Sequence, residues 1–164
     1  MRLTERDFVG DSRDIAQRLI GMNLGRLVNT ITYRGRIRET GAYHGYIERG
    51  KRKGLAYAPG RIYMHSAPRG YWLLAIATGS EGEPSVVTIR ELYPLEGVDR
   101  AVHSAGLLTR SLNIGKEFDG LSIAGNELWI EGTPIDSKDV VFISPNGSKK
   151  PMSANCLGYY RGLY

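Results

Sequence analysis

The chain has 164 residues, of which 41% are hydrophobic and 24% charged, a balance typical of a soluble globular protein. This length suits one domain with a single substantial core, and we expect residues 1–164 to form it. No apolar run is long enough to span a bilayer, and we expect no secretory signal at the N-terminus. The single cysteine, Cys156, cannot form an internal disulfide, which favours the reducing cytoplasm.

The net charge of +5 and the isoelectric point near 9.4 favour an anionic partner. Each basic side chain that meets a phosphate releases condensed counterions, so a positive surface helps to hold a nucleic acid. The basic residues are clustered at Arg34, Arg36 and Arg38, at Arg49, Lys51, Arg52 and Lys53, and at Lys149 and Lys150. Ordinary solvated faces remain the alternative, above all for the last pair.

The first predicted element is a helix that starts near residue 12 and carries an apolar stripe of Ile15, Leu19 and Ile20. Ser12 or Asp11 can cap it, and Gly21 can end it. Residues 24–33 and 36–43 follow, rich in β-branched and aromatic residues. With the Arg34-Gly35 pair between them, they predict an antiparallel hairpin. Residues 44–61 are rich in glycine and basic residues and predict a loop.

Two nearly continuous apolar runs, residues 71–77 and 86–89, predict buried central strands. Beyond Pro94 the pattern favours short helices over residues 98–104 and 107–112. Residues 127–132 and 140–143 return to a strand pattern, and residues 144–148 predict a loop. The whole pattern predicts a single α+β domain with a mainly antiparallel curved sheet and a few short helices.

Residues 35–45 combine arginines, a carboxylate and an aromatic ring along one strand. Side chains alternate along a strand, so Glu39 and Tyr43 should project to the same face as Gly41. Arg36, Arg38 and Thr40 should then project to the other face. Gly41 would leave a gap between an acid and a ring, which could hold a flat base. An ordinary half-exposed strand is the alternative.

This segment and four others resemble, in the same order, the alkyladenine (3-methyladenine) DNA glycosylases. The other segments are residues 16–21, 60–63, 88–97 and 108–114. The resemblance spans roughly residues 12–143 and is thin beyond Ile114. It implies an α+β fold and an enzyme that flips a damaged purine out of duplex DNA and hydrolyses its N-glycosidic bond without a covalent intermediate.

The resemblance also assigns roles to individual residues. Tyr43 matches a ring that stacks on the flipped base, and His65 falls where the family usually has a second stacking tyrosine. Pro68 falls near the wedge that fills the hole in the duplex. A tyrosine at the edge of the core and a simple β-turn at residues 67–70 are the alternatives for Tyr43 and Pro68.

At one position the chain departs from the family. Gly41 stands where the family has the acid thought to activate water. Glu39 is the candidate substitute as catalytic acid, although two residues along a strand is about 6.5 Å. The alternative is that Glu39 is a structural partner of Arg90 or Arg38. Glycosylase activity and an inactive damaged-DNA-binding module are therefore both compatible with the sequence.

The expected partner is duplex DNA that contains an alkylated or deaminated purine. The residues expected to contact it are Arg36, Arg38, Arg52, Lys53, Arg61, Arg69 and Arg90, and for Arg90 a structural ion pair is an equal alternative. Three scattered histidines and one cysteine lack metal-ligand spacing, so we expect no metal and no other cofactor. We expect a cytoplasmic, nucleoid-associated monomer with no membrane partner.

Overall fold

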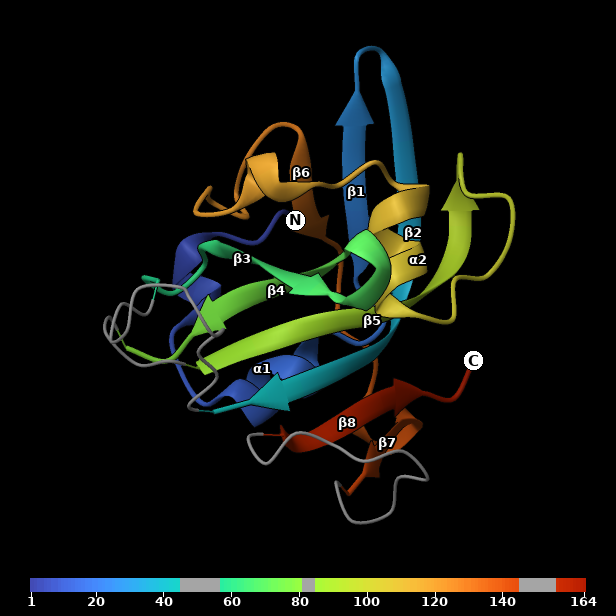
Figure 1. The fold of residues 1–164 in the computed structure, drawn as a ribbon. Helices are drawn as coiled ribbons and strands as arrows, with labels where there is room; N and C mark the ends of the chain where they lie inside the picture. Colours follow the sequence, from blue (N-terminus) through green and yellow to red (C-terminus); the bar gives the residue numbers. More distant parts are fainter. Residues whose placement is uncertain (45–56, 81–84, 145–155) are drawn as a thin grey trace.

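Strand-forming runs from both halves of the chain pair into one antiparallel sheet in the computed structural model, which describes residues 1–44, 57–80, 85–144 and 156–164 (Figure 1). The strands of the described residues are β1 (Asn23–Val28), β2 (Ile31–Tyr43), β3 (Ile62–Ala67), β4 (Tyr71–Thr78), β5 (Ser85–Glu96), β6 (Leu128–Glu131), β7 (Val140–Ile143) and β8 (Cys156–Gly162). Their order is β3-β4-β5-β2-β1-β6, and β8 pairs with both β2 and β7.

The helices of the described residues are short. They are α1 (Ser12–Leu19), α2 (Ala105–Ser111) and the 3₁₀ turns η1 (Glu5–Phe8), η2 (Pro68–Gly70), η3 (Lys116–Phe118) and η4 (Ser137–Asp139). Asp11 caps α1 by accepting a hydrogen bond from the backbone N–H of Arg13 at 2.8 Å, and Gly21 follows the helix with φ +87°. The predicted helix is confirmed, with Asp11 as its cap.

The apolar stripe of α1 packs on the sheet. Ile15, Ala16 and Leu19 are buried in the main core, together with Ile37 and Ile89 from β2 and β5. The two apolar runs predicted as central strands are now β4 and β5; residues 86–89 of β5 are buried as expected, and β4 is buried from Leu74 onward but only half-buried at residues 71–73. The fold class is therefore confirmed: a curved, mainly antiparallel sheet with a few short helices. None of the helices in the described ranges is long and apolar enough to cross a membrane.

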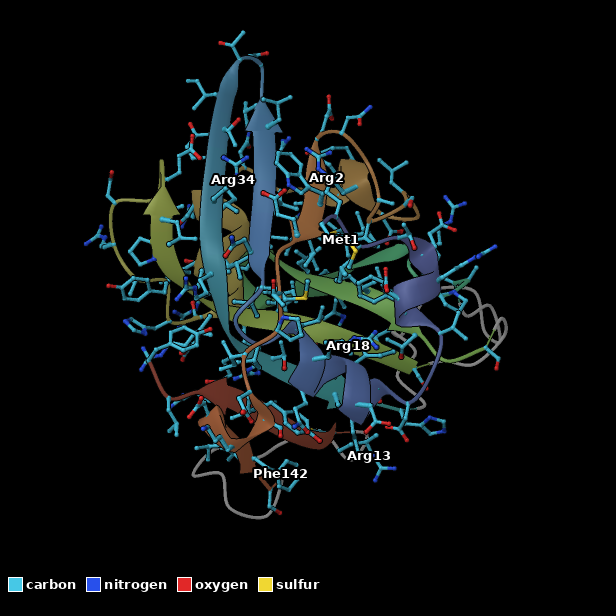
Figure 2. All side chains as sticks on the ribbon, turned by 180° about the vertical axis from the view of Figure 1, so that it is seen from behind. Met1, Arg2, Arg13, Arg18, Arg34 and Phe142 are labelled. Carbon is cyan, nitrogen blue, oxygen red and sulfur yellow. The ribbon has the colours of Figure 1, made fainter. Side chains whose placement is uncertain are left out.

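The predicted hairpin exists, but its turn was placed wrongly. Val28 pairs with Ile31, so the chain reverses at residues 29–30, where Asn29 takes φ +55°. Arg34 and Gly35 instead lie inside β2, below the tip of the hairpin (Figure 2). A Cβ atom on Gly35 would lie 2.9 Å from the Leu92 side chain, so this glycine serves a close approach between strands.

Two further predictions need correction. Residues 98–104 do not form a helix; Val102 forms an isolated bridge with Leu92, so tertiary pairing overrides the local pattern. The helix predicted over residues 107–112 starts earlier, at Ala105. Strands β3 and β8 were not predicted, and most of the loops predicted at residues 44–61 and 144–148 lies outside the described residues.

The long strand β2 is the centre of the sheet. Its first half pairs with β1, its second half pairs with β8, and β5 runs along its other edge. The pairing of β2 with β5 is irregular in the middle, where Arg38 faces no residue of β5 and Arg90 faces none of β2. These irregularities lie beside the residues that the sequence singles out, so they shape the candidate site.

Candidate functional site

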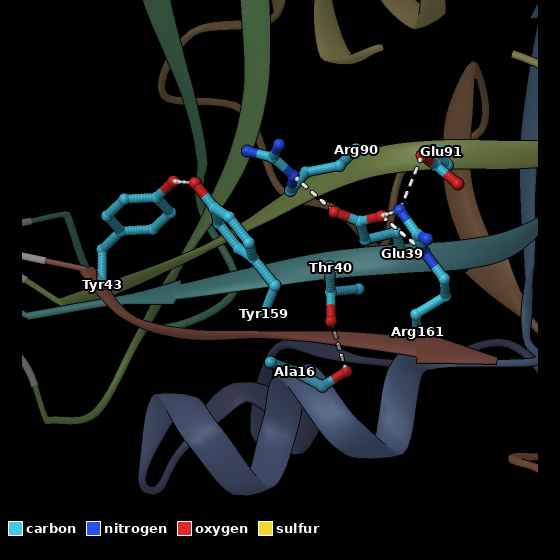
Figure 3. A network of polar contacts seen from close by, with 8 residues as sticks. All are labelled: Ala16, Glu39, Thr40, Tyr43, Arg90, Glu91, Tyr159 and Arg161. Atoms are coloured by element: carbon cyan, nitrogen blue, oxygen red, sulfur yellow. Dashed lines mark hydrogen bonds and ion pairs between the residues drawn. The ribbon is translucent and has the colours of Figure 1, made fainter. Parts of the chain in front are cut away.

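The second half of β2 presents different side chains to its two faces. The Thr40 hydroxyl donates to the carbonyl of Ala16 in α1 at 2.8 Å, whereas Glu39 and Tyr43 project to the opposite face (Figure 3). The predicted alternation is therefore confirmed for these three residues. The face that carries Glu39 and Tyr43 is the one turned away from α1.

A row of directly opposed residues crosses the sheet at Gly41. It runs through Tyr63 on β3, Ala75 on β4, Thr88 on β5, Gly41 on β2 and Tyr159 on β8. Opposed residues of an antiparallel sheet share a face, and neighbouring strands lie about 4.8 Å apart. Three small residues thus form a floor between two tyrosines.

Aromatic rings cover this floor in the structure. A Cβ atom on Gly41 would lie 3.0 Å from Cδ1 and Cε1 of Tyr159 and 3.0 Å from Cε2 of Tyr43. Ala75 and Thr88 are only 2% and 7% exposed. The open gap predicted between Glu39 and Tyr43 is therefore wrong, because the ring of Tyr159 from β8 fills the space above Gly41.

Tyr43 and Tyr159 meet at their hydroxyl groups. The two oxygens are 3.4 Å apart, and the two rings lean toward each other above β2 (Figure 3). Burial, followed by the hydrogen bond to Tyr159, raises the pKa of the Tyr43 hydroxyl far above its usual value. The ring of Tyr43 is half-buried and packs on a small cluster of Tyr63, Ala75 and Val86, separate from the main core. Tyr43 is therefore a neutral ring at the edge of the molecule's interior.

Glu39 is held by two arginines. Its Oε1 accepts from Nε of Arg90 at 3.0 Å, and its Oε2 accepts from Nε and Nη2 of Arg161 at 2.9 and 2.5 Å. Arg161 also donates to Oε1 of Glu91 at 3.3 Å, so two carboxylates face two guanidinium groups. The side chain of Glu39 is only 4% exposed. Both its oxygens are engaged, as the structural interpretation of Glu39 requires.

The irregular pairing of β2 with β5 explains this cluster. Glu39 lies directly opposite Glu91, an arrangement that would be repulsive without compensating charge. Because Arg90 has no partner on β2, its side chain reaches the same face as Glu91, and it binds Glu39 (Figure 3). Arg90 also stacks on Tyr159, with its Cζ atom 3.9 Å from the ring centroid.

Glu91 makes stability depend on pH. Burial, and then the charge of Glu39, raise the pKa of Glu91 despite the attraction of Arg161. A carboxyl whose pKa is raised in the folded state stabilises the fold below its unfolded pKa, and this contribution is lost as the pH rises through the folded value. We therefore expect Glu91→Gln to increase the free energy of unfolding at pH 7 and to change it less near pH 4. Urea unfolding at the two pH values checks this, and a Glu91→Gln protein that is less stable than the wild type at pH 7 would contradict it.

The other predicted pocket residues lie on the neighbouring hairpin. His65 is half-buried on β3, two residues beyond Tyr63 and therefore on the same face. Pro68 opens the turn η2 between β3 and β4, in which Arg69 takes φ +69°. The segment forms a 3₁₀ turn, which is compatible with both interpretations, and the wedge role of Pro68 stays a prediction.

The predicted DNA-contacting residues differ in their surroundings. Arg36 is exposed and its Cζ lies 5.5 Å from the ring centroid of Tyr164, and Arg38 is half-buried. Arg61 forms an ion pair with Glu5 at 3.7 Å, and Arg90 is bound to Glu39. The positions of Arg52 and Lys53 lie outside the described residues. Arg69 is exposed and forms no ion pair with a described acid.

Sequence reasoning missed Tyr159 and Arg161, which complete the site from β8. In the structure the residues of β8 alternate in burial, with Tyr160 buried and Tyr159 and Arg161 half-buried, but the sequence CLGYYRG has no matching alternation of apolar and polar residues that would have shown this. Within the ranges that the structure describes, no group of three or more histidine, cysteine or acidic residues could hold a metal ion. The site therefore offers rings, guanidinium groups and paired carboxylates.

Tyrosine rings, guanidinium groups and two carboxylates thus lie together on one face of an antiparallel sheet. A sequence model described as Methylpurine-DNA glycosylase (MPG) matches residues 6–145. The chain belongs to this DNA glycosylase family. Strand β8, with Tyr159 and Arg161, follows the matched residues.

Individual relatives agree with this assignment. A protein of Anaeromyxobacter dehalogenans strain 2CP-1, provisionally named 3-methyladenine DNA glycosylase, is 32% identical over 86% of this chain and 72% of its own length. Its counterpart in strain 2CP-C, under the same provisional name, is 34% identical over 86% of this chain and 73% of its own length. One from Clostridium botulinum strain Langeland is 35% identical over 74% of this chain and 61% of its own length.

Proposed function

We propose that this protein is a DNA N-glycosylase that binds duplex DNA, takes a damaged purine out of the stack and hydrolyses its N-glycosidic bond. Its membership of the glycosylase family is the observation that carries the proposal. The position of Tyr43 supports it, because the ring lies on the sheet face turned away from α1 and only partly in the interior. The net charge of +5 suits a polyanionic substrate.

The chemistry fits a base that is already a good leaving group. When alkylation has made the purine cationic, the bond from C1′ to the base breaks with its electron pair passing to the base, which leaves neutral. Water then adds its oxygen to C1′ and loses a proton to solvent. A carboxylate that orients this water is normally worth about a hundred- to ten-thousandfold. Gly41 provides no carboxylate at this position. We therefore expect slow release of the base, and faster release of those damaged purines whose N-glycosidic bond is already weak.

The test is release of the free base from duplex DNA under single-turnover conditions. We expect 3-methyladenine to be released faster than hypoxanthine, because hypoxanthine is neutral and leaves only after protonation. The same damaged duplex incubated without the protein is the control for spontaneous loss of the base. Complete absence of release from alkylated and deaminated purines would remove the glycosylase proposal.

A second candidate function is recognition of damaged DNA without catalysis. It is favoured by one observation: near Gly41, the carboxylates of Glu39 and Glu91 both engage arginines in the part of the chain that the structure describes. Under this proposal the protein binds a damaged duplex more tightly than an undamaged one, in a salt-sensitive manner, and releases no base. Binding and release measured on the same duplex distinguish the two functions.

A further inference from the structure

A groove lies beside the turn that joins β3 to β4. It has a volume of about 270 Å³, and its lining includes Arg69, Tyr71, Arg110, Asn113 and Glu117. The turn η2 lies against α2 (Figure 1), and the Thr109 hydroxyl of α2 donates to the carbonyl of Trp72 at 2.6 Å. The groove therefore lies between α2 and the start of β4, and a hydrogen bond joins these two elements.

The groove contains two arginines, Arg69 and Arg110, that pair with no acid of the ranges given in the structure. Arg34, Arg61, Arg90 and Arg161 all form ion pairs with carboxylates. Arg69 and Arg110 are exposed, and neither forms an ion pair with an acid of the described residues.

The one acid in the lining, Glu117, cancels only part of this charge. A Cβ atom on Gly115 would lie 2.5 Å from Oε2 of Glu117, so that carboxylate rests against the backbone at Gly115. Two arginines and one carboxylate leave the groove with a net positive charge, which suits an anionic ligand.

Arg110 is already positioned to receive such a ligand. Its Nη1 donates to the hydroxyl of Tyr71 at 3.2 Å, and its Cζ lies 5.3 Å from the centroid of the same ring. A guanidinium group has five N–H donors, and this contact uses one. Because Tyr71 restricts the arginine, less side-chain entropy is lost when a ligand binds.

We infer that this groove binds a backbone phosphate of the DNA next to the damaged nucleotide, with Arg110 and Arg69 as its contacts and Tyr71 as a positioning residue. The inference rests on the proposed function, because the turn that carries Arg69 also carries Pro68, the expected wedge. A duplex engaged by that turn would bring its backbone to the groove. Planar guanidinium groups are well suited to phosphate oxygens.

The experiment measures the affinity for an undamaged duplex as the salt concentration rises from about 50 to 200 mM. Arg110→Gln and Arg69→Gln should each weaken binding about tenfold at the lowest salt. Each should also reduce the slope of log K against log salt by about one, because one phosphate contact is lost. Arg110→Lys keeps the charge and should keep the slope.

The matched control is Arg13→Gln. Arg13 is also exposed, but it lies on α1 (Figure 2) and is paired with Asp11 at 3.0 Å. We expect its substitution to leave both affinity and slope unchanged. Tyr71→Phe should weaken binding less than Arg110→Gln and leave the slope intact, since the charge and the ring remain and only the hydrogen bond to the hydroxyl is lost.

The outcomes separate the inference from the proposed function. If the wild type binds duplex but Arg110→Gln and Arg69→Gln keep the wild-type slope, the phosphate site is wrong and the proposed function stands. If the wild type binds neither the undamaged duplex nor one that contains a damaged purine, the proposed function falls and the inference falls with it. Arg69 is exposed on a turn, so its variant tests the site even where Arg110→Gln lowers stability.

Discussion

The double variant Gly41→Glu/Tyr159→Ala is expected to release a damaged purine at least about a hundred times faster than Tyr159→Ala alone. A carboxylate at position 41 would lie beside the expected base-stacking ring of Tyr43, where it can orient water and offset the positive charge on the sugar. Removing the Tyr159 ring supplies the space that the new side chain needs. Single-turnover release from a duplex containing 3-methyladenine is the measurement.

Gly41→Glu alone should not give this gain. A Cβ at this position would already lie 3.0 Å from the rings of Tyr43 and Tyr159, so the longer side chain must displace them. We expect a loss of about 1–3 kcal/mol in stability, which Tyr159→Ala should partly relieve in the double variant.

Gly41→Gln/Tyr159→Ala is the control, since it fills the same space without a negative charge. Equal rates for the glutamate and glutamine double variants would show that the carboxylate contributes nothing at this position.

Glu39→Ala is expected to lower the free energy of unfolding by about 3 kcal/mol. The substitution leaves Arg90 and Arg161 without the carboxylate that binds both, and Glu39 itself is almost fully buried. This loss of stability lies at the lower end of the range for breaking a buried ion pair. The side chains of Arg90 and Arg161 are 32% and 43% exposed, so solvent screens their charge. Urea unfolding of the two proteins measures the difference.

Glu96→Ala is a matched control on β5. Its carboxylate also binds an arginine, Arg34, but its side chain is 53% exposed, so we expect a loss below about 1 kcal/mol. A Glu39→Gln protein with wild-type stability and base release reduced more than about a hundredfold would instead show that Glu39 acts on the substrate.

Local sequence patterns were sufficient for elements whose signals lie within a few residues. The apolar stripe of α1 and the continuous apolar runs of β4 and β5 predicted buried elements correctly. Local patterns failed where distant contacts decide. Gly35 looked like part of a turn, but its missing side chain accommodates Leu92 on β5. Residues 98–104 looked helical, but Val102 pairs with β5.

The candidate site could be predicted only in part. Alternation along β2 placed Glu39 and Tyr43 on one face correctly, and the need of a buried arginine for a partner anticipated the contact between Arg90 and Glu39. The ring above Gly41 could not be predicted, because it comes from β8 and depends on how that strand pairs with β2. The irregular pairing at Arg90 has no local signal either.

The pairing of β2 with β8 has a consequence for synthesis of the protein. Glu39 and Arg161 are 122 residues apart in the sequence. At about 5–20 residues per second, a ribosome makes Arg161 roughly 6–24 s after Glu39. During that interval the second half of one edge of β2 lacks its partner β8, and unpaired edges promote aggregation of nascent chains. A charge on such an edge opposes pairing with another chain, so Glu39 would protect this part of the nascent protein until β8, with Arg161, is translated.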